Sequence, residues 1–567
     1  MESPFNEFAL TPTGENSRTA LPLPRSLRHR APMLWLLLPF MVGIIAGRTI
    51  APIPSPTWLL TGALIAIIGA VFTVKRPAAW VISLCLGLVL TGAAYYELRR
   101  ARLAIWDNLP PREARLTLHI ERAFPTSPEG TQISGFAHIV QTDAHLDELM
   151  GQRLYFSLTR RPGEEPPIRS TEIAVIGVLQ TLPRIAPTDT FEGYLTNMGL
   201  NFRLNRGRIV AVSRPPSSYR LFCERTVAKM NALLGEGVFV KRPALTAILR
   251  AMMLGQKQEL STEQDALFMH SGTMHLFAIN GLHIGVVALS LHMLLMLLRC
   301  PRLAASLFTM AILWLDVDTT GASPSAVRAF MLVAAFEAAF ALRLPNNGIA
   351  ALANAALLVL VLDPTALFSA SFQLSYGVVM AIMCLGLPLA ERLQTRWQPY
   401  ADLPKVTWNR RQRALAQGLN WLAGALGIGW AATLVSALTG IQFFHLLVPG
   451  ALFANLVLVP LASLVIVAGF ISIASGLIGV VAISAWFNHA SLLVLWGIDT
   501  LIRFSSHLPG AWYPAAWRTP WLGPVTFTSL LSVCLTGYAL GWKRKRGGFW
   551  PPMIVTALTL VFCVKYG

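Results

Sequence analysis

The amino-acid sequence predicts a polytopic α-helical membrane protein with an inserted small β-barrel (OB-like) extracytoplasmic domain. The 567 residues are 54% hydrophobic and only 13% charged, and soluble domains typically carry about 25% charged residues. The positive mean hydropathy of +0.55 also indicates a membrane protein. Apolar runs long enough to span a bilayer recur along the chain, and one polar segment, residues 108–214, interrupts them.

The N-terminal part predicts a basic cytoplasmic tail, residues 1–31, followed by about three transmembrane helices in residues 32–105. The apolar runs are 33–50, 58–74 and 78–96. The first run lacks an A-x-A cleavage site, so we expect it to be retained, with the N-terminus in the cytoplasm. This orientation puts the arginines at 99, 100 and 102 outside, against the tendency of basic residues to stay cytoplasmic.

Residues 106–217 predict the extracytoplasmic OB-like β domain. Short segments there alternate between apolar and polar residues and are bounded by Pro and Gly, which is the pattern of strands. The clearest are 116–121, 135–140, 153–158 and 172–178. About five to six strands in a segment of this length suit a small barrel such as an OB fold, although the same pattern suits other small β domains.

Residues 218–567 predict a helical bundle, with amphipathic helices near 222–234 and 244–254 and then about nine to ten transmembrane helices. The basic segments 391–413 and 543–546 should both be cytoplasmic. An even number of crossings must therefore separate them. For this reason we expect the long apolar run at 445–477 to cross once and to include a broken or re-entrant piece.

The net charge of +18 has two interpretations. Cytoplasmic loops collect Lys and Arg, so membrane orientation alone explains much of the excess. Binding of a polyanion must be argued from where the basic residues lie.

Polar residues interrupt the apolar run at 271–285. Asn280-Gly281 is a turn signal, and irregular backbone persists in a bilayer only where it is buried in protein or faces a wet cavity. The segment from Leu282 would then be a half-helix whose N-terminus, beside His283, binds anions. The alternative is a kinked core helix in which His275 and His283 are satisfied by neighbouring groups.

A second pattern, at 319–329, puts a cation at the start of a spanning helix. Ser323 is a helix N-cap and Pro324 the first helical residue. Arg328 therefore lies in the first turns, where it opposes the helix dipole and is costly in lipid. A bound anion would relieve both effects, and snorkelling to the outer interface is the alternative. Gln373 in a later apolar helix either lines a polar path or bonds two helices together.

Five motifs in chain order resemble the ComEC family of DNA-uptake channels over residues 250–460. They are Leu254-Gly255 and the segments 271–285, 320–329, 363–376 and 454–460. The resemblance implies a competence-domain helical bundle that passes single-stranded DNA across the cytoplasmic (inner) membrane in natural transformation. Residues 191–199 are also similar to the sequence that closes the family's OB-like domain.

The resemblance implies two sets of DNA-contacting residues. A path through the membrane would be lined by His275, Asn280, Gly281, His283, Arg328 and Gln373. In the outer domain, charge and base stacking would guide one strand, and the candidates are Arg153, Tyr155, Phe156, Arg160 and Arg161. Ordinary structural roles for these five side chains are the alternative.

The sequence departs from the family pattern in two ways. The family usually has Ser at the position of Asn280, and many members carry a metallo-β-lactamase-like domain whose His-x-His-x-Asp-His signature does not occur here. We therefore expect no catalytic residues, no metal and no cofactor, and a separate nuclease for the second strand. Because there is no Walker motif, the energy would come from a cytosolic ATPase, the membrane potential, or capture by single-strand DNA-binding or recombination-mediator proteins. A periplasmic or surface DNA receptor would deliver the substrate.

Two other function classes stay open at this point. A small-solute or proton-coupled transporter would use Glu337, although the internal repeats common in such folds are not seen. An intramembrane metal-dependent enzyme would use side chains from the set His275, His283, Asp316 and Asp318. These residues lack a known ligand spacing such as H-E-x-x-H.

Overall fold

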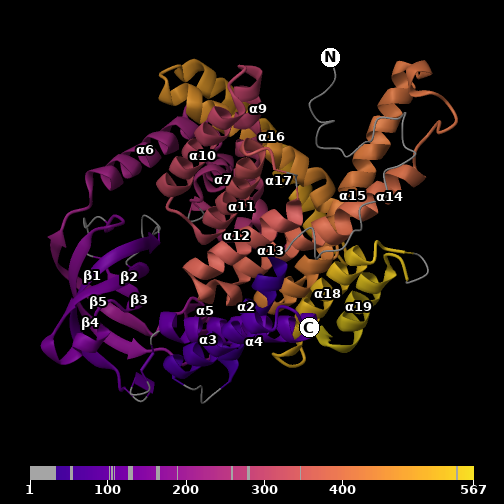
Figure 1. Cartoon of the computed structure of the whole chain (residues 1–567). Coiled ribbons are helices and arrows are strands. Elements are labelled where there is room, and N and C mark those ends of the chain that lie inside the picture. The colour runs from indigo at the N-terminus through magenta and orange to yellow at the C-terminus, as the bar shows by residue number, and fades with distance from the viewer. Residues whose placement is uncertain are drawn as a thin grey trace.

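The computed structural model describes residues 33–566 except 51–54, 101, 104–105, 108, 125–131, 161–165, 188–189, 257–258, 278–280, 345–346 and 544–546. The predicted tail at 1–31 lies outside the described residues. A β-barrel lies beside a large α-helical part (Figure 1). The predicted fold class, a polytopic helical membrane protein with an inserted small barrel, is confirmed.

The barrel has five strands, β1 Arg112–Phe124, β2 Gln132–Thr142, β3 Arg153–Thr159, β4 Glu172–Thr181 and β5 Phe202–Arg214. They close in the order β1-β2-β3-β5-β4, with β3 and β5 parallel and the other neighbours antiparallel. In β4 every second residue from Ile173 to Leu179 is buried, because successive side chains point to opposite faces. Leu118, Ile133 and Leu158 fill the interior. A short 3-10 helix, η3 Ala144–Leu149, follows β2.

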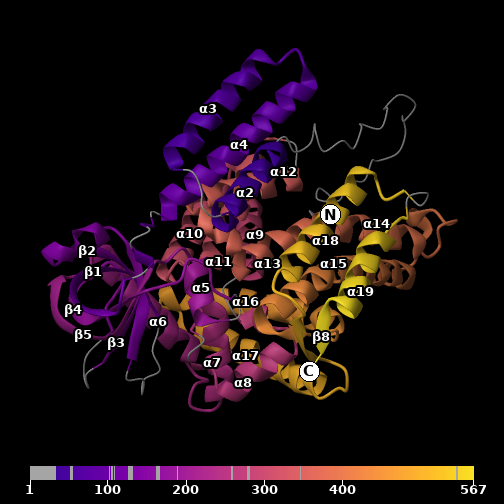
Figure 2. The same ribbon diagram turned by 90° about the horizontal axis from the view of Figure 1, so that it is seen from below.

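The N-terminal helices are α2 Leu34–Thr49, α3 Pro56–Phe72 and α4 Pro77–Arg100. Helices α2 and α4 approach closely at two glycines. A Cβ on Gly92 would lie 2.4 Å from the carbonyl oxygen of Phe40, and one on Gly43 would lie 2.1 Å from the carbonyl oxygen of Val89. Small residues permit such contacts between helices in a membrane. Helices α3 and α4 form a hairpin that projects from the rest of the molecule (Figure 2).

The main helical part follows the barrel. Its helices are α6 Ser218–Gly235, α7 Pro243–Leu254, α8 Thr262–His270, α9 Gly281–Leu297, α10 Arg302–Thr319, α11 Pro324–Ala341, α12 Gly348–Leu362, α13 Ala370–Ala381, α14 Leu387–Arg396, α15 Arg410–Phe444, α16 Ala451–Leu477, α17 Val481–Ser506, α18 Leu522–Ala539 and α19 Trp550–Phe562. Short helical turns are η5 Met274–Phe277, η6 Pro364–Phe368, η7 Ile382–Gly386 and η8 Lys405–Thr407. A small sheet joins β6 Leu446–Leu447, β7 Tyr513–Trp517 and β8 Val564–Tyr566.

Seven helices in the described part of the chain are long and apolar enough to cross a membrane. They are Pro77–Arg100, Pro324–Ala341, Ala370–Arg396, Arg410–Phe444, Ala451–Leu477, Val481–Ser506 and Leu522–Ala539. Shorter apolar helices, including α2, α3, α9 and α12, accompany them. The apolar run at 445–477 forms one long helix, α16, after the two-residue strand β6. The chain is a multi-pass membrane protein.

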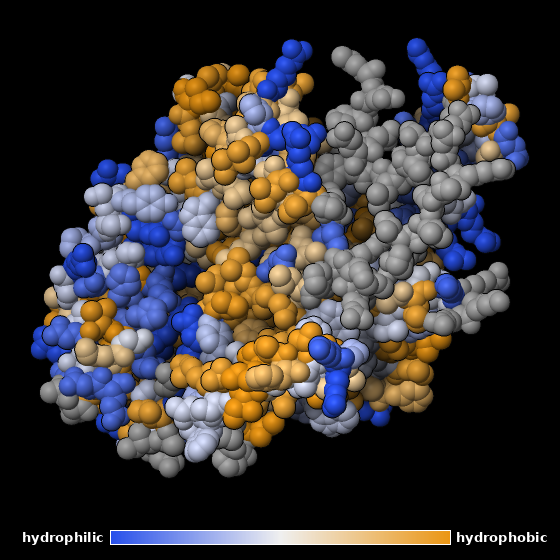
Figure 3. Space-filling view, in the orientation of Figure 1, coloured by the Kyte–Doolittle hydropathy of each residue, from blue (hydrophilic) through white to orange (hydrophobic). Residues whose placement is uncertain are grey.

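Two helices, α5 Phe191–Asn197 and α6, lie at the junction between the barrel and the helical part. Helix α6 leaves the barrel after β5 and packs on α10, α16 and α17. The short helix α5 lies between the barrel and the helical part in both ribbon views (Figures 1 and 2). In the space-filling view, hydrophilic side chains gather over the barrel, and the helical part exposes mainly hydrophobic ones (Figure 3). The polar surface therefore meets the apolar one along this junction.

Candidate functional site

A cavity of about 410 Å³ lies where the barrel meets the loop between α10 and α11. We call it the cationic pocket. The barrel contributes side chains from β1, β2, β3 and the β3–β4 loop, α6 contributes Arg220, and the α10–α11 loop contributes Gly321, Ala322 and Pro324. The pocket therefore lies where the barrel, α6 and the α10–α11 loop meet.

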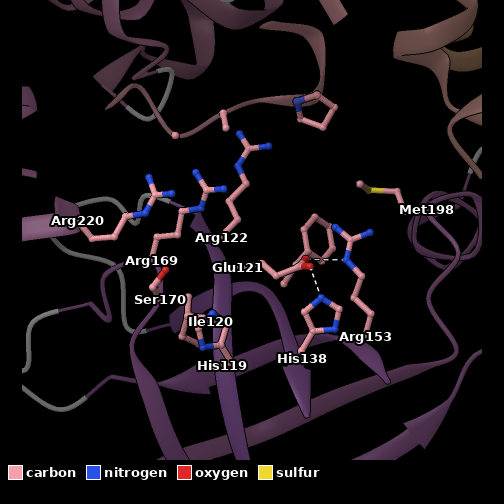
Figure 4. Close-up of a pocket in the computed structure, with 14 residues that line it drawn as sticks. His119, Ile120, Glu121, Arg122, His138, Arg153, Arg169, Ser170, Met198 and Arg220 are labelled. Carbon is pink, nitrogen blue, oxygen red and sulfur yellow. Dashed lines mark hydrogen bonds and ion pairs between the residues drawn. The ribbon is translucent and has the colours of Figure 1, made fainter. Parts of the chain in front are cut away.

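Four arginines line the cationic pocket, namely Arg122, Arg153, Arg169 and Arg220. In the close-up, Arg122, Arg169 and Arg220 stand side by side with their guanidinium groups turned the same way (Figure 4). Burial lowers the pKa of Arg122, and the groups whose charges act on it are Tyr194 and Arg169, with no described carboxylate among them. Arg122 is therefore a cation available to an anionic ligand.

Glu121 holds Arg153 and His138 at one wall of the pocket. Arg153 Nε donates to Glu121 Oε2 at 2.6 Å, and His138 Nε2 lies 2.5 Å from Oε1 (Figure 4). Burial alone would raise the pKa of Glu121, but the hydrogen bond from His138 and the charge of Arg153 lower it to about 2. The same hydrogen bond raises the pKa of His138 above its usual value. Glu121 is therefore ionised, and it partly neutralises this wall.

Asp318, near the end of α10, joins the barrel to the helices. Its Oδ1 accepts from Arg169 at 2.9 Å, and its Oδ2 accepts from Arg220 at 2.9 Å and from the Tyr219 hydroxyl at 2.8 Å. Only 7% of the Asp318 side chain is exposed. Charge-assisted hydrogen bonds of this kind are about twice as strong as neutral ones. Asp318 thus holds two of the four pocket arginines next to the start of α11.

The α10–α11 loop leads from the cationic pocket to a buried cation. Gly321 and Ala322 both have positive φ, 94° and 47°, and Ser323 caps α11 by accepting from the Ala326 N–H at 3.3 Å. This fulfils the cap predicted from Ser323-Pro324. One turn further along, Arg328 is 4% exposed. The rise from Pro324 to Arg328 is about 6 Å, so both residues belong to one short stretch of helix.

Neutral side chains of α13 surround Arg328. Its guanidinium donates to Ser371 Oγ, whereas its Nε and the Tyr376 hydroxyl have no hydrogen-bond partner among the described residues. Gln373 donates to the Leu367 carbonyl oxygen at 3.3 Å. A buried cation with neutral neighbours is energetically unfavourable. A bound anion would lower this cost.

The other predicted path residues lie on or near α9, which packs against α11. Gly281 is the first residue of α9, directly after residues 278–280, which lie outside the described residues, and His283 is 3% exposed in the first turn. His275 is exposed in η5, and its Nδ1 lies 3.1 Å from the Gly272 carbonyl oxygen. Asn280 lies outside the described residues. Gly281, His283, Arg328 and Gln373 are therefore on three helices, α9, α11 and α13, that pack in sequence.

The structure places only some of the predicted outer-domain residues at or near the pocket. Arg153 lines the pocket, and the Tyr155 ring lies 6.2 Å from that of Phe136. Arg160 follows the other end of β3 and is not among the residues lining the pocket, and Arg161 lies outside the described residues. The prediction that Phe156 contacts DNA is wrong, because its side chain is fully buried in the barrel interior and exposes no face to a base.

Sequence reasoning missed most of the pocket. On β1, His119 and Glu121 lie on the outward side because Leu118 and Ile120 point inward, and this alternation was a usable signal for both. Strict alternation would put Arg122 inward, and it lines the pocket where the β1–β2 register shifts between Ile120 and Arg122. Arg169 and Arg220 are 51 positions apart in the chain and meet at Asp318. No local pattern predicts that meeting, because it depends on how the barrel docks.

Glu337, the residue of the transporter alternative, pairs with a histidine. Glu337 Oε1 is 3.0 Å from His292 Nδ1, a pair that links α11 to α9. In the described part of the chain, no three His, Cys, Asp or Glu side chains are grouped so that they could hold a metal ion. Asp318 is engaged by arginines.

Comparison of the sequence with known proteins identifies its family. Residues 252–540 match the protein family described as Competence protein. The chain belongs to the Competence protein family. ComE operon protein 3 of Bacillus subtilis (strain 168) is 30% identical over 141 residues, which are 25% of this chain and 18% of that protein. No solved structure matches the chain.

The resemblance to the ComEC family is thereby confirmed. The family match covers α9, α11 and α13, which carry the predicted membrane-path residues. The barrel, Arg169 and Arg220 precede the matched residues. The chain aligns with well under two thirds of the Bacillus relative, 18% of its length.

Proposed function

We propose that the protein passes single-stranded DNA across the cytoplasmic membrane in natural transformation. The cationic pocket would be the entrance and Arg328 the first phosphate contact at membrane depth. The observation that carries the proposal is the junction itself. A pocket with four arginines opens beside the loop that starts α11, and Arg328 lies buried one turn along that helix. A chain of phosphates matches a series of cations spaced in this way.

The way these cations are held suits a moving polymer. Glu121 and Asp318 share three of the four pocket arginines, so a phosphate must compete with a carboxylate for each of them. Conduction requires binding that is favourable enough to enter and weak enough to leave. Arg328, whose guanidinium donates to Ser371 among the described residues, would add a single strong contact rather than a closed cage.

The remaining parts of the proposal concern location and partners. The N-terminus would be cytoplasmic, which puts the barrel outside, and the membrane would be the inner membrane. A periplasmic or surface receptor would deliver DNA, a separate nuclease would remove one strand, and a cytosolic ATPase with single-strand DNA-binding or recombination-mediator proteins would draw the other inward. On this view the chain itself transports DNA and does not cleave it.

Transformation of the native host tests the proposal. A deletion strain is complemented with wild type, Arg328→Gln, Arg328→Lys and Arg122→Gln, with membrane levels checked, and uptake of labelled DNA is measured. Arg115→Gln is the matched control, because Arg115 is exposed on the same strand as Arg122 but does not line the pocket. Loss of uptake with Arg328→Gln and Arg122→Gln, but not with the control, supports the proposal. A deletion strain that transforms normally overturns it.

The Glu337–His292 pair supports a second candidate, proton-coupled solute transport. A carboxylic acid beside a histidine at membrane depth is a common proton site in transporters, and both side chains are less than one fifth exposed. A Glu337→Gln strain that transforms normally but loses growth on a particular solute would favour this candidate over DNA transport.

A further inference from the structure

A row of five aromatic rings runs from the barrel onto α5. We call it the ring row. The centroid distances are 5.1 Å for Phe124–Phe136, 6.2 Å for Phe136–Tyr155, 5.1 Å for Tyr155–Phe191 and 6.2 Å for Phe191–Tyr194. Neighbouring strands β1, β2 and β3 supply the first three rings, and α5 supplies the last two. Each ring is thus within the distance at which aromatic pairs attract one another.

The ring row is buried at its centre and exposed on α5. Phe136 is 2% exposed, whereas Phe191 is 53% and Tyr194 is 47% exposed. These two rings lie nearly parallel, with an interplanar angle of 23°. Two large aromatic side chains with this much exposed area add little to the free energy of folding, because about half of each side chain stays in solvent. Their outer faces are available to a ligand with flat, stackable groups.

The ring row is continuous with the cationic pocket. Arg122 lies over Phe124 at 5.6 Å and Arg153 over Phe136 at 5.5 Å, and both arginines line the pocket. The charge of Arg122 also acts on Tyr194. Met198, the residue that follows α5, lines the pocket as well, and the helical rise from Phe191 to Met198 is about 10 Å. Stackable rings and phosphate-binding cations therefore follow one another along α5.

We propose that Phe191 and Tyr194 stack on bases of one DNA strand and guide that strand along α5 into the cationic pocket. This inference rests on the proposed function and adds a selection step to it. Stacking on aromatic side chains is tolerant of sequence because every base has a π-face. In a duplex those faces are already covered by neighbouring base pairs, so the rings select single-stranded over duplex DNA.

The competing occupant of two exposed rings is the membrane interface, where Tyr and Phe side chains also gather. The surroundings favour nucleic acid. Glu192, between the two rings in sequence, pairs with Arg203 at 3.0 Å, and the neighbouring pocket is charged rather than apolar. A strand approaching the pocket would meet the rings first.

Binding measurements on the full chain in nanodiscs of neutral phosphatidylcholine test this inference. Fluorescence anisotropy is recorded with an oligothymidylate of about 20 nucleotides and with a duplex of the same length. The test variant is Phe191→Leu with Tyr194→Leu, which keeps apolar side chains but removes the rings. Phe222→Leu is the control, because Phe222 is similarly exposed, at 54%, on α6 and outside the ring row. Phe191→Tyr with Tyr194→Phe keeps both rings and checks that the site tolerates substitution.

The double leucine variant should bind the single strand at least about tenfold more weakly, because the stacking of bases on both rings is lost. Its duplex affinity and salt dependence should stay unchanged, and the ring-swapped and control variants should bind as wild type does. If the leucine variant binds the single strand as tightly as wild type does, the ring-row inference is wrong but the proposed function is not. That result points to the membrane interface as the occupant of the two rings. An equal loss for single strand and duplex also overturns it. If the wild-type protein binds neither the single strand nor the duplex, the proposed function is wrong as well.

Discussion

Removing the charge of Asp318 should strengthen the hold of the cationic pocket on DNA. Four arginines face two carboxylates, Glu121 and Asp318, so two positive charges are uncompensated when the histidines are neutral. Asp318→Asn raises that number to three. For single strands, log Kobs changes with log[salt] by about −0.7 for each phosphate neutralised. The slope should therefore steepen by about 0.7, with tighter binding at low salt.

The assay is the affinity of the nanodisc-embedded chain for an oligothymidylate over a series of salt concentrations. Asp107→Asn is the control, because Asp107 also pairs with an arginine, Arg102 at 2.6 Å, but that arginine does not line the pocket. Its slope should equal that of wild type. A slope that is unchanged or shallower in Asp318→Asn would refute the idea that Asp318 competes with phosphate. It would leave Asp318 as a purely structural link between α10 and the barrel.

Three further predictions concern other parts of the molecule. Hydrogen bonds to charged groups contribute about 1.5–3 kcal/mol, so Arg328→Gln should lower DNA uptake about tenfold or more, and Arg328→Lys should retain part of it in the same labelled-DNA assay. The hydrogen bond to Glu121 raises the pKa of His138 above 6.5. Protonated His138 therefore stabilises the barrel fully below about pH 6.5, and this stabilisation is lost as the pH rises through the raised pKa. His138→Gln should therefore lower the Tm of the purified chain at about pH 6 and have little effect at about pH 9, and an equal effect at both would contradict the assignment. Gly92→Ala should destabilise the α2–α4 contact by about 1–3 kcal/mol and reduce membrane levels, whereas Gly497→Ala, where a Cβ meets no atom within 4 Å, should not.

The barrel was predictable because alternation is a local signal. The segments 153–158 and 172–178 became β3 and β4 with nearly those bounds. The same rule applied consistently would have excluded Phe156 from the DNA-contacting set, since it shares the inward face with Leu154 and Leu158. The error came from choosing residues by type rather than by face.

Long-range pairing was not predictable. The arginines near the end of α4 conflicted with the positive-inside tendency in the sequence, and the structure gives them partners. Arg99 donates to the Leu362 carbonyl oxygen at 2.5 Å, at the end of α12, where a cation complements the helix dipole. Arg100, which is 3% exposed, bonds within its own helix to the Tyr96 hydroxyl at 3.2 Å. The role of Arg99 requires knowing that α4 and α12 meet, which is a property of the assembled bundle.

The path residues fall between these cases. The cap at Ser323 and the start of α9 at Gly281 follow from local turn and capping chemistry, so they could be placed in advance. That Ser371 of α13 meets Arg328 could not, because it depends on the packing of α11 against α13.

Closure of the barrel limits how this domain recognises other molecules. Each of the five strands is paired on both sides, so no free strand edge remains for an incoming peptide to extend the sheet. Proteins that dock here must therefore bind through side chains and loops. The barrel is also protected from joining edge to edge with a second copy, which is useful for a domain that stays tethered at high local density on a membrane.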